Sequence, residues 1–108
     1  MAHYLIEAAY SRQGISDLIK TPQDRAEAIR PVVEGMGGKM ESFYFAFGDY
    51  DPVVIVELPD NVTAAALAMA VGSSPGISKY KTTVLMTMSE AMKAMGKAGG
   101  TGYRSPSG

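Results

Sequence analysis

Two acidic side chains stand on short apolar segments where they could exchange protons. Glu7 lies within residues 3–10 and Glu57 lies within residues 53–58, and both segments have the composition of β-strands. If the two strands are neighbours, a low-dielectric environment raises the pKa of one carboxyl group, as a general acid or base requires. The alternative is that each carboxylate pairs with a basic side chain such as Lys81, or lies at a solvated rim.

His3 is the one imidazole of the chain. A neutral imidazole can act as a base or as a haem ligand, but a histidine at the first residue of a strand is also typical of a solvated edge. The chain has no cysteine, which excludes disulfides, thiolate nucleophiles and zinc–sulfur sites. A metal site would therefore depend almost wholly on carboxylates, and we predict neither a metal nor a cofactor.

A polar turn, Gly48-Asp49-Tyr50-Asp51, separates two apolar segments. A structural interpretation gives glycine the backbone freedom of the turn, lets the aspartates accept bonds from nearby amides, and packs Tyr50 over the hairpin. A functional interpretation makes Tyr50 and Asp51 a hydrogen-bonding pair at the mouth of a cavity. Tyr4, Tyr10, Tyr44 and Tyr80 could grip an aromatic ligand, although alternating aromatic residues in strands are ordinarily core.

The elements that must position these side chains follow a β-α-β-β-α-β order. We expect strands at 3–10, 39–47, 53–58 and 77–88, and helical segments at 14–20, 21–36, 60–71 and 89–95, with Thr21, Asp60 and Ser89 as N-caps. Pro31 should bend the second helical segment. The order predicts an α+β, ferredoxin-like antiparallel sheet with the first and third strands at its centre. Residues 1–95 form one domain, and residues 96–108 form a Gly/Ser-rich tail.

The two faces of this sheet differ in composition. A two-residue loop, Asp49-Tyr50, would place Tyr44 opposite Ile55, whereas a three-residue loop would invert the second strand. The first register sends an apolar set under the helices: Tyr4, Ile6, Ala8, Phe43, Phe45, Phe47, Val54, Val56 and Leu58. The helix after Asp60 would pack through Val62, Ala65, Ala66 and Met69.

The opposite face is too apolar for bulk water and too polar for a plain core. It carries His3, Leu5, Glu7, Ser42, Tyr44, Val53, Ile55, Glu57, Lys81, Thr83 and Leu85. A second sheet packed about 10 Å away explains such a face best. We therefore expect a homodimer with a polar pocket in the seam.

Composition excludes several classes of partner. The chain has 108 residues and a formal charge of −1, and its folded part has no basic patch for nucleic acid or an anionic membrane. The first residues lack the pattern of a secretory signal, and no apolar run approaches the ~20 residues of a membrane span. These observations predict a cytoplasmic protein.

The ordered set of motifs resembles the GYD-domain family. Gly48-Asp49-Tyr50-Asp51 is similar to its Gly-x-Tyr-Asp signature, and Gly37-Gly38-Lys39, Pro59-Asp60 and the threonines of the last strand (Thr82, Thr83 and Thr87) also fit. The resemblance covers about residues 3 to 92. It implies a dimeric α+β barrel, a group that includes cofactor-free monooxygenases, isomerases, haem-handling proteins and ligand-sensing domains. It implies no catalytic residue.

The leading hypothesis is a homo-oligomer that binds a small organic molecule between the sheet and a partner subunit. The candidate ligand-binding residues are His3, Glu7, Tyr44, Tyr50, Asp51, Glu57 and Lys81. The first alternative is a small cofactor-independent oxygenase or isomerase that uses Glu7 or His3 as base and Tyr44 as donor. The second alternative is an assembly module without a pocket.

Overall fold

Four antiparallel strands form one sheet in the order β2-β3-β1-β4. The computed structural model describes residues 1–107. The strands are β1 (Ala2–Tyr10), β2 (Lys39–Phe45), β3 (Pro52–Leu58) and β4 (Ile77–Leu85), and the helices are α1 (Arg12–Lys20), α2 (Arg25–Gly35), α3 (Asn61–Gly72) and α4 (Met88–Gly99). This is the expected α+β, ferredoxin-like arrangement, with β1 and β3 at the centre.

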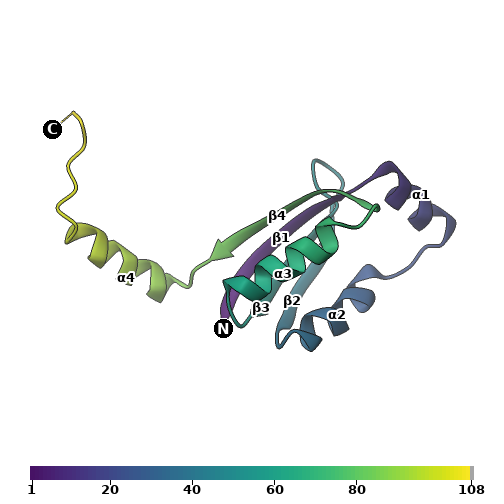
Figure 1. The fold of residues 1–108 in the computed structure, drawn as a ribbon, viewed down its shortest axis with the longest axis horizontal. Coiled ribbons are helices and arrows are strands. Elements are labelled where there is room, and N and C mark those ends of the chain that lie inside the picture. The colour runs from purple at the N-terminus through teal and green to yellow at the C-terminus, as the bar shows by residue number, and fades with distance from the viewer. Residues whose placement is uncertain (108) are drawn as a thin grey trace.

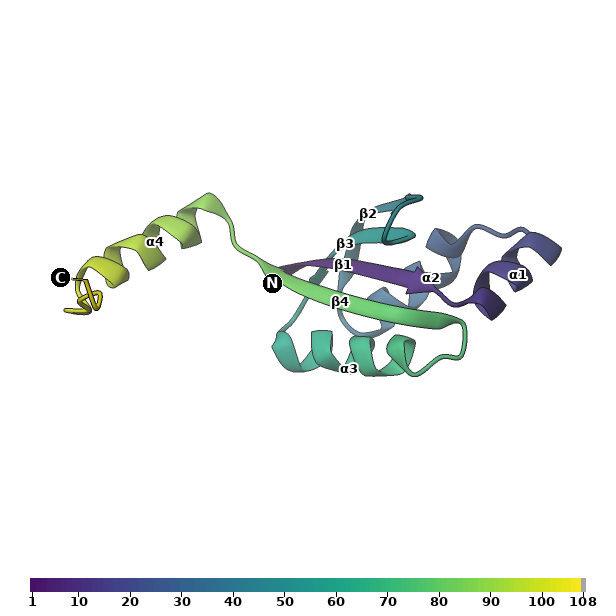
Figure 2. The ribbon, with the colours of Figure 1, turned by 90° about the horizontal axis from the view of Figure 1, so that it is seen from above.

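Helices α2 and α3 cover the same face of the sheet, as Figures 1 and 2 show. The core lies between them and the strands, and its most deeply buried side chains are Tyr4, Val33, Val56 and Leu58. The phenol of Tyr4 is satisfied there, because its hydroxyl donates to Oδ1 of Asn61 at 2.6 Å. No helix within residues 1–107 combines the length and the apolarity needed to cross a membrane.

The two central strands follow the expected alternation. On β1, Tyr4, Ile6 and Ala8 are buried while the residues between them are half-buried, and β3 repeats this pattern at Val54, Val56 and Leu58. Successive side chains of a strand point to opposite faces, so the prediction of which residues lie under the helices is confirmed for β1 and β3.

The predicted register of β2 is wrong. Tyr44 lies opposite Val53 rather than Ile55, because residues 46–51 form a longer connection than a two-residue turn. The shift of two positions leaves Phe43 on the helix side. Phe47 falls in the loop and is 97% exposed, and Phe45 is also largely exposed, although its ring stacks on Tyr10 with centroids 6.1 Å apart.

A bulge near Glu41 interrupts the alternation of inward and outward side chains along β2. The pairing changes register between Met40 and Ser42, so that Met40 is buried opposite Val56. One extra residue in one strand reverses the face of every side chain beyond it. The bulge therefore turns Glu41 away from the core, where an unpaired carboxylate would be costly.

Two predicted helix starts are corrected by the capping contacts. Asp24, not Thr21, caps α2 by accepting the amides of Ala26 and Glu27. Thr87, not Ser89, caps α4 in a reciprocal capping box with Glu90. The predicted N-cap Asp60 of α3 is confirmed: it accepts the amide and hydroxyl of Thr63, which lowers the pKa of its carboxyl group.

Helix α3 packs through a different side from the predicted one. Ala64 and Leu67 are buried, whereas Val62 and Met69 are 79% and 73% exposed. Apolar residues occur all round this helix, so spacing alone did not distinguish its inner side. The inner side was decided by the sheet on which α3 lies.

The last helix extends away from the rest of the fold. Figures 1 and 2 show α4 leaving the end of β4 and projecting beyond the sheet. The radius of gyration is 17.3 Å, compared with about 13 Å for a compact chain of this length. Helix α4 continues to Gly99, past the point where the composition becomes rich in glycine and serine.

The corrected packing of α3 predicts unequal costs for truncating two of its apolar side chains. Leu67→Ala should lower the free energy of unfolding by about 2–5 kcal/mol, because it leaves a cavity in the core. The control Met69→Ala should change it by less than about 0.5 kcal/mol. Urea unfolding followed by circular dichroism measures both, and equal losses would contradict this orientation of the helix.

Candidate functional site

The face opposite α2 and α3 is uncovered within the described chain, and we call it the open sheet face. Strand pairing arranges its side chains in three rows that run across the sheet in the order β2, β3, β1, β4. The rows are Lys39–Glu57–His3–Leu85, then Ser42–Ile55–Leu5–Thr83, then Tyr44–Val53–Glu7–Lys81. Apolar residues occupy its middle, and charged groups concentrate in the two outer rows.

His3, in the first row, lies between the carboxylates of Glu41 and Glu57. Its Nδ1 is 2.9 Å from Oε1 of Glu41, and its Nε2 is 3.8 Å from Oε1 of Glu57. His3 and Glu41 border a shallow groove of about 260 Å³ on the open sheet face, which also includes Ile55, Leu85, Met86 and Thr87. The structure thus brings the predicted residues His3 and Glu57 together.

Glu7 and Glu57 do not form a close pair. Glu57 is the register partner of His3, and Glu7 is the register partner of Val53, four residues further along β1. At about 3.3 Å per residue the two positions are roughly 13 Å apart. Glu7 has Lys81 as its cross-strand partner on β4, an arrangement of opposite charges that favours the pairing.

The His3, Glu41 and Glu57 cluster is the one grouping of possible metal ligands found among residues 1–107, with its ligand atoms within 4.8 Å of one another. The two carboxylates approach different nitrogens of one imidazole ring. An imidazole gives an ion only one of its nitrogens, so at most one of these two contacts could become part of a shared coordination shell.

Sequence reasoning missed Glu41. Strict alternation from Phe43 would have placed Glu41 under the helices, where burying an unpaired carboxylate is unfavourable. That conflict was the available signal for the bulge that directs Glu41 to His3.

Asp51 of the Gly48-Asp49-Tyr50-Asp51 turn holds the end of β1. Its carboxylate Oδ2 accepts the amide of Tyr10 at 2.8 Å, and its own amide donates to the carbonyl of Ala8 at 2.8 Å. Tyr50 lies under the Nζ of Lys79, 5.0 Å from the ring centroid, in a cation–π contact. These contacts match the structural interpretation of the turn.

Gly48 is not sterically required at its position. Its φ is not in the positive range, and a Cβ placed on it would have no heavy atom within 4 Å among the described residues. The contacts of the turn are therefore made by Asp51 rather than required by Gly48. The two candidate ligand-binding residues Tyr50 and Asp51 lie at the far end of β1 from the His3 cluster.

The anchoring role of Asp51 predicts a loss of stability on truncation. Asp51→Ala should lower the free energy of unfolding by about 1–3 kcal/mol, because the Tyr10 amide loses a charged acceptor. The control Asp49→Ala removes an exposed carboxylate of the same turn and should have almost no effect. Thermal unfolding compares the two variants, and equal midpoints would contradict the anchoring role.

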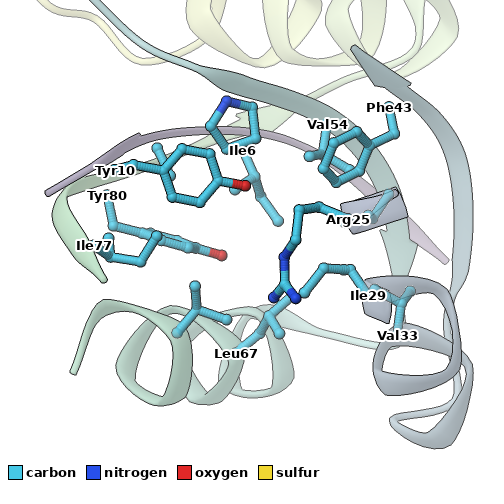
Figure 3. A pocket seen from close by; sticks show the side chains of 14 residues that line it. Ile6, Tyr10, Arg25, Ile29, Val33, Phe43, Val54, Leu67, Ile77 and Tyr80 are labelled. Carbon is cyan, nitrogen blue, oxygen red and sulfur yellow. The ribbon is translucent and has the colours of Figure 1, made fainter. Parts of the chain in front are cut away.

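A second hollow lies between the sheet and helices α2 and α3, and we call it the sheet–helix cavity. It has a volume of about 70 Å³ and largely apolar walls, which include Ile6, Val33, Val54, Val56 and Leu67. Figure 3 shows the phenol oxygens of Tyr10 and Tyr80 and the guanidinium of Arg25 directed into this space.

Partial burial shifts the pKa of the two phenols. It raises the pKa of Tyr80 to about 12. It also raises the pKa of Tyr10, although the nearby positive charge of Arg25 partly opposes the change. Both hydroxyls are therefore protonated at neutral pH and able to donate. Sequence reasoning considered these tyrosines as core residues or as a grip for an aromatic ligand, and it missed Arg25 because nothing local links that residue to strands β1 and β4.

The raised pKa of Tyr80 predicts a loss of stability in alkali. The neutral, half-buried phenol contributes fully below about pH 10, its ordinary pKa, and this contribution declines as the pH rises toward 12. Tyr80→Phe should therefore show a shallower fall in urea midpoint between pH 10 and pH 12 than the unmodified protein. Tyr103→Phe, at a position 79% exposed, is the control, and a slope for Tyr80→Phe that equals this control would refute the prediction.

The fold defines a ferredoxin-like α+β domain with an open sheet face and a sheet–helix cavity. A family model, the GYD domain, matches residues 4–95. The chain therefore belongs to the GYD domain family, as its motifs indicated. The comparison with curated proteins gave no match.

Proposed function

We propose that this GYD-domain protein forms a homodimer through the open sheet face and binds a small organic molecule between that sheet and the partner subunit. The observation that carries the proposal is the groove beside His3, where the imidazole and the carboxylate of Glu41 adjoin the apolar side chains of Ile55 and Leu85. Polar groups beside an apolar wall can orient a small ligand.

The composition of the open sheet face supports association. Its middle row contains Leu5 and Ile55, which are only half-buried in a single chain. Tyr44, at the edge of the sheet in the third row, is 71% exposed. Burying this surface against a second sheet would remove apolar area from water at roughly 25 cal/mol per Å². Two matching faces related by a two-fold axis make such an interface self-complementary.

The same association would roof the groove. Alone, the groove is open to solvent, which weakens hydrogen bonds and charge interactions with a ligand. A partner sheet would exclude water and place the His3, Glu41 and Glu57 cluster in the seam. Glu7, Tyr44 and Lys81 would line the same seam about 13 Å away. The cytoplasmic location and the exclusion of nucleic-acid and membrane partners stay predictions from composition.

A charge in the middle row should prevent the association. Ile55→Lys would place an ammonium group in the apolar centre of the interface, where desolvation is costly. Light scattering at micromolar concentration should give the dimer mass for the unmodified protein and the monomer mass for this variant. Val62→Lys, on exposed α3, makes the same chemical change outside the interface and should stay dimeric.

Two results would overturn the association: a monomeric unmodified protein, or dimers of unchanged stability for both Ile55→Lys and Tyr44→Asp. Tyr44→Asp serves as a second variant because Tyr44 is largely exposed, so its replacement leaves the folded monomer intact. Native mass spectrometry of protein purified from its source would report the subunit count and any retained ligand together. A dimer without a ligand would favour an assembly module, and loss of turnover with retained binding in Glu7→Gln would favour an enzyme.

A further inference from the structure

We propose that the sheet–helix cavity is a second binding site, on the opposite side of the sheet from the dimer seam, for a small organic carboxylate with a short apolar tail. Arg25 would bind the carboxylate, Tyr10 and Tyr80 would donate hydrogen bonds to it, and the apolar walls would hold the tail. The proposal depends on the cavity within one chain and not on association through the open sheet face.

Arg25 is a half-buried cation without an acidic partner. Within residues 1–107 no carboxylate oxygen lies within 4.0 Å of its guanidinium. Its Nη1 donates to Oε1 of Gln23 at 2.8 Å, a neutral acceptor that leaves the positive charge uncompensated. A guanidinium beside apolar walls favours an anion, and its planar fork matches the two oxygens of a carboxylate.

Arg25 also lies where the inner cavity opens outward. It lines the cavity of about 70 Å³ and two surface grooves of about 390 Å³ and 520 Å³. A ligand can therefore enter along a groove, leave its charged group at Arg25 and insert its tail between the sheet and α3. The small inner volume restricts that tail to a few carbon atoms.

The remaining charges around the cavity are compatible with an anion. Asp17 and Asp24 line the outer grooves and not the inner cavity. The carboxylate of Asp24 is engaged with the amides at the start of α2, and that of Asp51 with the amide of Tyr10. The inner space is thus left with one cation, two phenols and apolar walls, which fit a carboxylate better than a cation or a sugar.

Titration with butyrate, followed by amide chemical shifts in nuclear magnetic resonance spectra, tests the proposal. Saturable shifts of Ile29 and Ile77, which line the cavity, are expected, with a dissociation constant on the order of millimolar. Butyramide has the same shape without the charge and should bind about tenfold or more weakly. Equal responses to the two probes, or no saturable response to butyrate, would overturn the proposal.

Variants of α2 assign the binding to Arg25. Arg25→Gln should weaken butyrate binding about tenfold or more, since one charge-assisted contact is lost. Arg30→Gln removes an exposed arginine of the same helix, which lies beside Glu27, and should leave the affinity unchanged. Tyr10→Phe should weaken binding by a smaller factor, and it tests the site separately if Arg25→Gln alters the folded spectrum. Unchanged affinity in both Arg25→Gln and Tyr10→Phe would exclude this site.

The two proposals can fail separately. All the walls of the sheet–helix cavity lie on the helix side of the sheet, so Ile55→Lys should retain butyrate binding whatever its subunit count. Loss of binding in that variant, with a folded spectrum, would show that the cavity site is not independent of the seam.

Discussion

Two helices cover one face of a four-stranded sheet, no other part of residues 1–107 covers the opposite face, and the rest of the structure depends on this imbalance. Because side chains alternate along a strand, β1 and β3 each carry one series of side chains buried under the helices and a second series on the open sheet face. The buried series builds the core around Tyr4, Val56 and Leu58. The second series forms a surface that is apolar at its middle and charged in its outer rows.

The same alternation produces two different chemical environments from one sheet. On the helix side, β1 and β4 bring two half-buried phenols to the first residue of α2, where an arginine has no acidic partner among residues 1–107. On the open side, the other end of β1 brings an imidazole between two carboxylates. An uncompensated cation and a carboxylate cluster would favour ligands of different charge, and the sheet keeps these two environments apart.

The residues of the family signature make contacts that position the strands around them. Asp51 binds the backbone of β1 at two points, through its carboxylate and its amide, which aligns the β2–β3 connection with the central strand. Tyr50 packs against Lys79 of β4. The turn thereby contacts both β1 and β4. Its Asp51 accepts the amide of Tyr10, whose side chain lines the sheet–helix cavity.

Much of the fold was predictable because its signals are local. The order of elements, the central place of β1 and β3, their buried faces and the Asp60 cap of α3 each follow from a pattern contained in a few neighbouring residues. The start of α2 was missed because Thr21 and Asp24 are both competent caps, and only the path of the chain after α1 selects between them. The orientation of α3 was missed because its apolar residues surround it.

The sequence by itself therefore determined the family, the sheet topology and the separation of the two faces, since strand periodicity and turn residues are properties of short segments. The tertiary structure alone decided that Glu41 turns toward His3, that Phe47 leaves the core, and that Arg25 meets Tyr10 and Tyr80. These outcomes depend on one bulge, one loop length and the packing of helices from distant parts of the chain. The stability of each arrangement comes from contacts between residues that are distant in the sequence, and no local pattern connects those residues.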